Sequence, residues 1–278
     1  MADLGASIAA AVAAWGVDHV TVAVRRGDHD ALVVGDPERV YALASVTKLF
    51  TAVATLVAVE EGALTLDQPA GPPGATVEHL LAHTSGLGFD GSEPLTTPGR
   101  RRIYSNAGFE TLAETVTAAT GIDFATYATE AVLTPLDLAS TEIAGSPAAG
   151  WRSNAADVLT LVEQVRQPTL LAPETMARAT TVAFPGLAGV LPGVGRYDPL
   201  DWGLGFEIRD GKAPHWTGTA NSPHTVGHFG GSGTFAWCDP DAATSCVALT
   251  DRGFGDWALQ VWPELSDLLL TNGDSRPT

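Results

Sequence analysis

Lysine is nearly absent from this sequence of 278 residues, and basic residues in general are scarce. Lysine occurs only at positions 48 and 212, and 15 Lys and Arg residues stand against 32 Asp and Glu, which gives a formal net charge of -17 at pH 7. Because such a charge repels polyphosphate, we expect no nucleic-acid partner. The only basic clusters are Arg25-Arg26 and Arg100-Arg101-Arg102. The second cluster is either a solvated loop, which is the simpler interpretation, or a region that attracts anionic substrates.

Cysteine and long apolar runs are also missing. Cys238 and Cys246 are too few for a disulfide framework, and although they could lie close across a hairpin, packed thiols are the simpler interpretation. No apolar stretch approaches the roughly 20 residues that cross a bilayer. The Ala-rich start from Asp3 to Trp15 carries an acid and precedes the first basic residue, Arg25, unlike a signal peptide. We therefore expect an amphipathic first helix, no membrane contact and a cytoplasmic location.

The composition predicts a folded, enzyme-sized globule. Apolar residues make up 45% of the chain and charged residues 17%, while Gly and Pro are scattered along it. These proportions exclude disorder and collagen-like repetition. A chain of this length can bury a substantial core, either as one large domain or as two lobes that share a site.

Strand patterns lie near both ends of the chain, and helical periodicity dominates the middle. Two β-branched runs separated by Gly27-Asp28 predict a hairpin, and strand patterns return after a Gly- and Pro-rich link at 185–199. A helix is predicted from Ser45 to Glu61, and a last one after Gly255. The expected strands are 20–26 and 31–34, which form the hairpin, and 205–209, 233–238 and 245–250. The remaining expected helices are 77–82, 107–120, 124–133, 155–167 and 173–181.

Early and late strands around a helical insert predict a mixed α/β fold of the α+β type. Its antiparallel sheet is built from the N- and C-terminal segments and flanked by helices, and its middle lobe is mainly helical. We expect one catalytic domain over 1–278, with a sheet lobe from 1–66 and 200–278 and a helical lobe over 67–199. The site is expected in the cleft between the lobes.

Ser45-Val46-Thr47-Lys48 places a hydroxyl and an amine three residues apart on one helix, within reach of a shared proton. Burial and the positive end of the helix dipole both favour loss of the proton from the amine, and the dipole also favours a developing oxyanion. Alternatively, Ser45 is only a helix N-cap and Lys48 a solvated residue. An accidental Ser-x-x-Lys is expected in about one such sequence in ten, so other motifs must support this interpretation.

Tyr104-Ser105-Asn106 offers a phenol that can move a proton and an amide that can hold a substrate carbonyl. The alternative is a packed loop tyrosine before a helix that Asn106 caps. Further along, His228-Phe229-Gly230 lies in a Gly-rich segment before a strand, where bare backbone could offer N–H groups to an oxyanion. By itself this segment could equally be an ordinary turn.

In this order, Ser45-x-x-Lys48, Tyr104-x-Asn106 and His228-x-Gly230 resemble the motifs of the serine β-lactamase and penicillin-binding protein superfamily, and most of all those of class C β-lactamases. The segments from His79 to Leu87 and from Pro98 to Phe109 are similar to that family too, so the resemblance spans most of the chain.

The resemblance implies a β-lactamase/transpeptidase-like fold and an acyl-enzyme on Ser45, with Lys48 and Tyr104 handling the proton. It further implies a set of groups that face the substrate. These are Asn106, His228 and Gly230 as substrate contacts, and the backbone N–H groups of Ser45 and Gly231 as the oxyanion hole.

The sequence departs from the class C pattern where His228-Phe229-Gly230 replaces the usual Lys-Thr-Gly. A His with an ordinary pKa near 6.5 is mostly neutral at pH 7, and Phe229 removes a hydroxyl that in the family helps to hold the substrate carboxylate. We therefore expect a serine hydrolase of small neutral esters or amides, as in β-lactamase-related esterases. A β-lactamase or a D-amino-acid peptidase is the alternative enzyme, and a non-catalytic binding module on the same fold is the alternative of another class.

No cofactor and no metal is expected. His79 and His83 have the spacing of a zinc site on a helix, but Leu80 stands where the metalloprotease pattern needs Glu. A packed or capping role at the end of a helix is simpler for both histidines. No Gly-x-Ser-x-Gly elbow and no phosphate-binding Gly loop occurs in the sequence. The expected partner is a small-molecule ester, amide or β-lactam, and the oligomeric state stays open.

Overall fold

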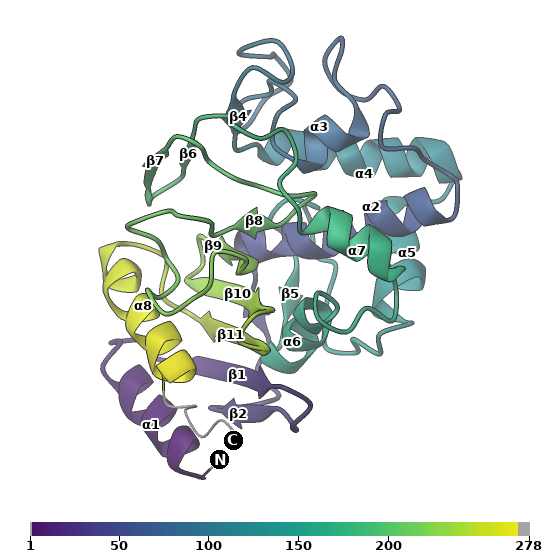
Figure 1. Cartoon of the computed structure of the whole chain (residues 1–278). Helices are drawn as coiled ribbons and strands as arrows, with labels where there is room; N and C mark the ends of the chain where they lie inside the picture. Colours follow the sequence, from purple (N-terminus) through teal and green to yellow (C-terminus); the bar gives the residue numbers. More distant parts are fainter. Residues whose placement is uncertain (1, 272–278) are drawn as a thin grey trace.

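A six-stranded antiparallel sheet forms the centre of the computed structural model, which describes residues 2–271 (Figure 1). The strand order is β2-β1-β11-β10-β9-β8. The strands are β1 (Val20–Arg26), β2 (Leu32–Val34), β8 (Glu207–Ile208), β9 (Val226–Gly230), β10 (Thr234–Asp239) and β11 (Thr244–Thr250). β1 pairs with β11 along its whole length, so the two ends of the chain build one sheet, as the sequence predicts.

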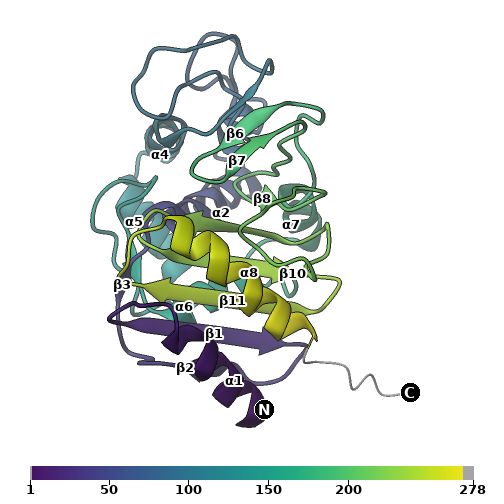
Figure 2. The same ribbon diagram turned by 90° about the vertical axis from the view of Figure 1, so that its left-hand side faces the viewer.

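Helices cover both faces of this sheet. α1 (Ala2–Ala13) and α8 (Asp256–Thr271) lie on one face, and α2 (Thr47–Glu60) and α6 (Ala155–Glu163) lie on the other (Figure 2). Successive residues of a strand point to opposite faces, so Val22 and Val24 pack in the core beneath α1 and α8 while Ala23 joins the core beneath α2 and α6. The expected mixed α/β fold is confirmed.

The remaining elements surround α2 and the end of the sheet. They are α3 (Val77–Leu81), α4 (Asn106–Thr120), α5 (Phe124–Ala128) with a π-helical turn at Thr129–Leu133, α7 (Pro173–Ala179), a small sheet of β3 (Tyr41–Ala42) and β5 (Arg152–Ser153), and a second small sheet of β4 (Arg102–Ile103), β6 (Gly189–Leu191) and β7 (Gly195–Tyr197). Both ribbon views place β6 and β7 beyond the β8 edge of the large sheet (Figures 1 and 2). The division into lobes at residues 66 and 199 stays a prediction.

Two segments that the sequence presents as turns and links are strands. β9 lies within the supposed Gly-rich turn, and β6 and β7 form a hairpin inside the supposed link at 185–199. Glycine disfavours strands locally, but a side chain on Gly227 would overlap the carbonyl oxygen of Ala236 in β10. Close approach of two strands therefore requires glycine there, and tertiary contact overrides local propensity.

The arginine cluster divides between surface and core, so the interpretation as a solvated loop is wrong for one of its members. Arg100 and Arg101 are exposed, but Arg102 is 1% exposed. Its guanidinium donates to four backbone carbonyls, those of Ala82, Ala183, Phe184 and Leu200. A buried cation is tolerated when its donors are satisfied in this way. Burial also lowers the pKa of Arg102 to about 10.

Cys238 and Cys246 are free, buried thiols. They lie on opposite faces of the sheet, Cys238 in the core beneath α2 and α6 and Cys246 in the core beneath α1 and α8, so they cannot pair across the hairpin.

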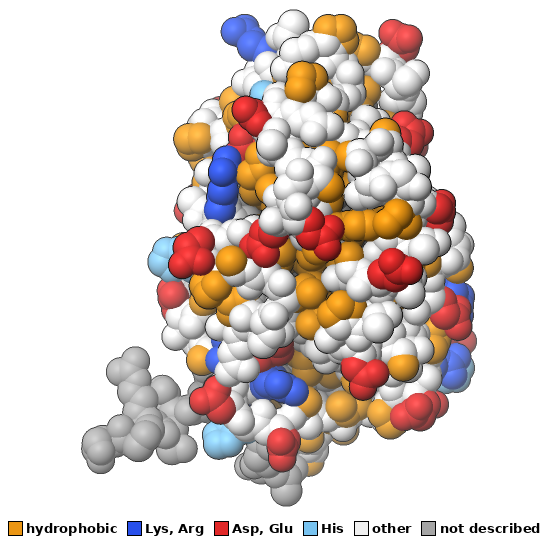
Figure 3. All heavy atoms as spheres, turned by 90° about the vertical axis from the view of Figure 1, so that its right-hand side faces the viewer, with side chains coloured by type: hydrophobic (Ala, Val, Ile, Leu, Met, Phe, Trp, Pro, Cys, Tyr) orange, Lys and Arg blue, Asp and Glu red, His pale blue; other side chains and the backbone are white. Residues whose placement is uncertain are grey.

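Within residues 2–271, no helix has the length and apolar character needed to span a membrane. Acidic side chains are spread over the face drawn in Figure 3, with few basic ones among them.

Candidate active site

Ser45 lies where the chain turns into α2. It occupies a 3-10 turn, Ala44–Val46, and Lys48 follows in the first turn of α2. The turn between β9 and β10 holds the chain just before Ser45, because Ser232 Oγ donates to the carbonyl of Ala42 at 2.6 Å and Thr234 Oγ1 to that of Leu43 at 2.9 Å. The serine is therefore fixed between a helix start and the edge of the sheet.

Lys48 is buried against Ser45, so the alternative of a solvated lysine is wrong. Its Nζ lies 3.2 Å from Ser45 Oγ and donates to Asn106 Oδ1 at 2.6 Å and to the carbonyl of Ala148 at 2.8 Å. Burial lowers the pKa of Lys48 to about 7, against the opposing effect of two nearby carboxylates. A neutral amine has two N–H groups, which these two carbonyls take, so its lone pair faces the Ser45 hydroxyl.

Tyr104 stands on another side of the same hydroxyl. Burial raises the pKa of Tyr104, while a hydrogen bond with Ser45 opposes that shift. Its ring centroid lies 4.8 Å from Lys48 Nζ, and its hydroxyl lies 3.4 Å from His228 Nε2. A hydroxyl between an amine and a phenol can lose its proton to one of them and regain one later.

His228 is neutral in this arrangement. Its Nδ1–H donates to the carbonyl of Phe229 at 2.7 Å, which leaves Nε2 to accept the hydrogen bond from Tyr104. Burial, together with the charge of Lys48, lowers the pKa of His228 to about 3. The ring of Phe229 packs in the aromatic core, with its centroid 4.7 Å from that of Phe254. Neither residue therefore presents a positive charge or a hydroxyl to a ligand.

Asn106 is the first residue of α4 and reaches Lys48, but it does not cap that helix. Ser105 is the N-cap, and its Oγ accepts from the N–H of Gly108 at 2.9 Å. The alternative in which Asn106 serves as a cap is therefore wrong. With its Oδ1 on Lys48, the Asn106 amide directs Nδ2 to Asp90, 3.3 Å away.

The two histidines with zinc spacing do not share a helix face. α3 ends at Leu81, so His83 lies outside it, 1% exposed, and its Nδ1 accepts from the backbone N–H of Ser105 at 3.1 Å. His79 Nδ1 instead meets Thr76 Oγ1 at 2.8 Å. Among residues 2–271, no group of three or more His, Cys, Asp or Glu side chains could hold a metal ion.

Sequence reasoning missed two contributors to the site. The His83 ring packs against Tyr104 with 4.6 Å between centroids, and the carbonyl of Ala148 holds Lys48 Nζ. Burial lowers the pKa of His83 well below its ordinary value, so this support is uncharged. The family-like segment from His79 to Leu87 was the only signal for His83, and a backbone carbonyl leaves no signal in a sequence.

Gly230 and Gly231 end β9 beside the serine. A side chain on Gly230 would overlap the carbonyl oxygen of Leu43 and lie 2.5 Å from Thr234 Oγ1. The carbonyl of Gly230 accepts from the N–H of Gly233 at 3.0 Å. Because the two polar groups of a trans peptide point in opposite directions, the N–H of Gly231 is directed away from that turn and is free to face a ligand. Gly231 itself is exposed.

Gly230→Ala is expected to lower kcat/KM for ester hydrolysis about 100-fold, because the methyl group must push β9 away from the segment that carries Ser45. Gly211→Ala is the matched control, since Gly211 is exposed outside the site and no atom lies within 4 Å of the Cβ position there. Steady-state kinetics of both variants would check this, and equal rates would contradict the role of close packing.

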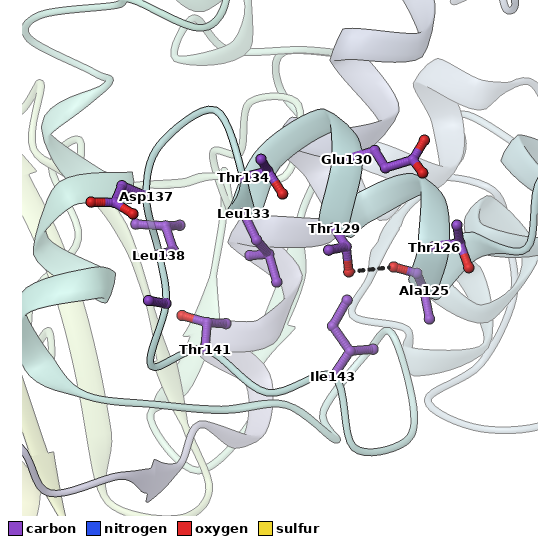
Figure 4. A pocket seen from close by; sticks show the side chains of 11 residues that line it. Ala125, Thr126, Thr129, Glu130, Leu133, Thr134, Asp137, Leu138, Thr141 and Ile143 are labelled. Carbon is purple, nitrogen blue, oxygen red and sulfur yellow. Dashed lines mark hydrogen bonds between the residues drawn. The ribbon is translucent and has the colours of Figure 1, made fainter.

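A large cavity lies away from these residues. Its volume is about 720 Å³, and its lining comes from α5, the π-helical turn and the segment up to Ile143 (Figure 4). Thr129 donates there to the carbonyl of Ala125 at 2.8 Å (Figure 4). None of the predicted site residues lines it, so cavity size does not identify the site.

Comparison with known proteins agrees with the resemblance seen in the motifs. The β-lactamase family model matches residues 5–270. A β-lactamase of known structure from Mycobacterium bovis is 50% identical, with a TM-score of 0.93, over 95% of this chain and 98% of that chain. A penicillin-binding protein homologue from Caulobacter crescentus shares the fold, with a TM-score of 0.78 at 19% identity over 97% of each chain.

Among curated proteins, esterase EstB from Burkholderia gladioli is 33% identical over 137 residues. That match covers 44% of this chain and 31% of the esterase, so it spans less than a third of the length of that relative. The family model, by contrast, covers nearly the whole chain, and the six-stranded sheet with its helical layers has the β-lactamase/transpeptidase-like architecture. The chain therefore belongs to the β-lactamase family and is a hydrolase of the β-lactamase fold.

Proposed function

We propose that this protein hydrolyses small esters or amides that carry no charge next to the scissile bond, through an acyl-enzyme on Ser45. The observation that carries the proposal is the placement of Lys48 Nζ, 3.2 Å from Ser45 Oγ, with its other hydrogen-bonding directions taken by Asn106 and Ala148. A buried amine with a pKa of about 7 is a competent base at neutral pH.

A side chain or backbone N–H group of the site assists each step of the proposed reaction. Ser45 Oγ attacks the carbonyl carbon while its proton passes to Lys48 Nζ, and the carbonyl oxygen becomes an oxyanion that accepts from the N–H groups of Ser45 and Gly231. When the tetrahedral intermediate collapses, its bond to the leaving group breaks. Tyr104 gives the leaving atom a proton and recovers one from the Lys48 ammonium. Water then attacks the acyl-enzyme by the same route and releases the acid.

The groups around β9 support an uncharged reacting end. His228 accepts a hydrogen bond from Tyr104, and with its pKa lowered to about 3 it carries no positive charge at neutral pH. Phe229 is 8% exposed and packs on aromatic rings of the core. A carboxylate next to the scissile bond would therefore find no cation at this place. Asn106, already bonded to Lys48, is the side chain best placed to meet the substrate carbonyl substituent.

Intact-mass spectrometry with a fluorophosphonate probe tests this proposal. The probe should add one covalent mass to the protein, and peptide mapping should place it on Ser45. A protein that hydrolyses p-nitrophenyl acetate but gains its label elsewhere would contradict the assignment. No label and no hydrolysis would favour a non-catalytic binding module.

A β-lactamase is the second candidate, favoured by the 50% identity to the Mycobacterium bovis protein over nearly both chains. Nitrocefin distinguishes the two candidates. We expect p-nitrophenyl acetate to be the better substrate by kcat/KM, and the reverse order would favour the β-lactamase. Release of D-alanine from a D-alanyl peptide would instead favour a peptidase.

The activity is expected to rise with pH through a single ionisation near 7. Only unprotonated Lys48 can accept the Ser45 proton, so kcat/KM falls as pH drops through the Lys48 pKa of about 7 and reaches a plateau above it. His228, with a pKa of about 3, and Tyr104, with a raised pKa, add no second step between about pH 5 and 9. A profile measured with an uncharged ester checks this, and a midpoint near the ordinary lysine value of about 10.4 would contradict it.

A further inference from the structure

A second pocket, of about 380 Å³, opens beside Tyr104. Its size falls within the roughly 300–1,000 Å³ of small-molecule sites. Tyr104 forms part of its wall, and the other residues used below are the apolar Phe89, Leu95, Ile103 and Val190 and the basic Arg101 and Arg196. The reaction described above leaves this pocket without a role.

The floor of the pocket is one face of the small sheet formed by β4, β6 and β7. Ile103 lies opposite Val190, and Val190 lies opposite Arg196 in the strand registers. Residues directly opposite one another project from the same face of a sheet, so these three side chains form one row. The row places two apolar side chains beside one guanidinium.

Exposed apolar side chains gather here. Four large apolar side chains are exposed among the residues that the structure describes, and three of them line this pocket: Phe89 (49%), Leu95 (72%) and Val190 (55%). The fourth, Ile122, lies elsewhere. A gathering of exposed apolar surface beside a reactive group is typical of a ligand site rather than of ordinary surface.

The pocket continues directly from the catalytic groups. The carbonyl of Phe89 accepts from the backbone N–H of Asn106 at 2.7 Å, and the Phe89 ring lies 5.9 Å from that of Tyr104. Tyr104 is the group that returns a proton to the leaving atom in the proposed reaction. With the acyl carbon at Ser45, a substituent on that atom would lie beside Tyr104, which also lines this pocket.

Two arginines at the pocket have no acidic partner among the side chains that the structure describes. Arg101 and Arg196 are exposed, and neither forms an ion pair or a side-chain hydrogen bond with any of these side chains. Because both guanidinium groups lie at one pocket and no acidic side chain neutralises them there, together they attract an anion. Their positions differ from that of His228, so the charge they recognise is remote from the scissile bond.

We propose that this pocket binds the alcohol portion of the substrate, and that preferred substrates are esters whose alcohol portion is a medium-length apolar chain ending in a carboxylate. The inference rests on the proposed ester hydrolysis at Ser45. It adds the substrate class: the apolar row holds the chain, and Arg101 and Arg196 bind the distal carboxylate.

Three acetate esters test the proposal by kcat/KM in a pH-stat. Hexyl acetate should exceed ethyl acetate by at least about tenfold, because four more methylene groups are partly buried in the pocket. 6-Acetoxyhexanoate has a carboxylate where hexyl acetate has its terminal methyl group. Its kcat/KM should be several-fold higher than that of hexyl acetate at low salt, and this gain should shrink at high salt. If hexyl and ethyl acetate react equally, or if chain length matters only in the acyl series from ethyl acetate to ethyl hexanoate, the pocket assignment is overturned while the proposed function stands.

Matched variants assign the effects to residues. Val190→Asp should abolish the preference for hexyl over ethyl acetate, whereas Ile122→Asp, the same change at the other exposed apolar site, should retain it. Arg196→Gln should remove the gain from the carboxylate, whereas Arg100→Gln, on an exposed arginine outside the pocket, should not. Leu95→Asp, in a loop, serves as a second variant if Val190→Asp does not fold. Equal behaviour of each variant and its control would overturn the proposal.

A binding measurement separates this inference from the reaction itself. Ligand-observed NMR with the Ser45→Ala protein should detect 6-acetoxyhexanoate and show weaker binding after the additional change Val190→Asp but not after Ile122→Asp. This readout does not require turnover, so binding without hydrolysis by the wild type would contradict the proposed function and support the pocket. Binding that Val190→Asp leaves unchanged would overturn the pocket assignment.

Discussion

Ser45→Ala is expected to lower kcat/KM for p-nitrophenyl acetate by at least about 10⁴-fold, because no other group in the site can form the acyl-enzyme. The substitution removes one hydroxyl from a half-buried position whose backbone is held by the β9–β10 turn, so the fold should persist. Stopped assays at matched protein concentration, together with the fluorophosphonate label, measure the loss.

Ser92→Ala is the matched control for this experiment, because Ser92 is exposed in the loop before β4 and belongs to no part of the site. It should hydrolyse the ester and take the label as the wild type does. Equal rates for Ser45→Ala and wild type would end the acyl-enzyme proposal, whatever the sequence resemblance.

Lys48→Met is expected to lower kcat by about 10³-fold with a small change in melting temperature. Methionine fills nearly the same volume, and the loss of two hydrogen bonds, to Asn106 and Ala148, is partly offset because an amine no longer has to be buried. The base is lost but the packing remains. Rates measured beside thermal melting separate the two effects.

A substitution at the only other lysine in the sequence, Lys212, is expected to lower stability and leave activity nearly unchanged. Lys212 is 4% exposed, donates to the carbonyl of Asp201 at 3.1 Å and lies 3.7 Å from Glu207. Lys212→Met breaks this buried ion pair, so it should lower the free energy of unfolding by about 3 kcal/mol while leaving kcat close to wild type. If both variants lose stability and activity in parallel, Lys48 has only a structural role.

The site residues illustrate what sequence can and cannot supply. The order of Ser45, Lys48, Tyr104 and His228 along the chain predicted which side chains belong to the site. The structure brings Lys48 and Tyr104 to the Ser45 hydroxyl and His228 to Tyr104. Spacing alone did not reveal how Lys48 is held, because its third partner is the backbone carbonyl of Ala148, 100 residues away. Backbone acceptors depend on the fold and not on residue type.

Some elements of the fold could likewise be predicted from local sequence, and others could not. The sequence predicted β1, β11 and the terminal helices well, because their apolar periodicity is strong. It left a turn open for the segment of β9 and favoured a solvated Arg102, since glycine and arginine ordinarily behave so. In both cases contacts with other segments decided the outcome: the neighbouring strand β10 packs on Gly227, and four carbonyls from three separate segments surround Arg102.

The pairing of β1 with β11 has a consequence for biosynthesis. Val20 and Thr250 are neighbours in the sheet but are translated far apart in time, and β1 has only β2 beside it until β11 leaves the ribosome. Contacts of such long sequence separation form slowly. The β9–β10 turn that anchors the chain before Ser45 is also made late. The segment that carries Ser45 is therefore expected to become ordered only after β9, β10 and β11 have left the ribosome.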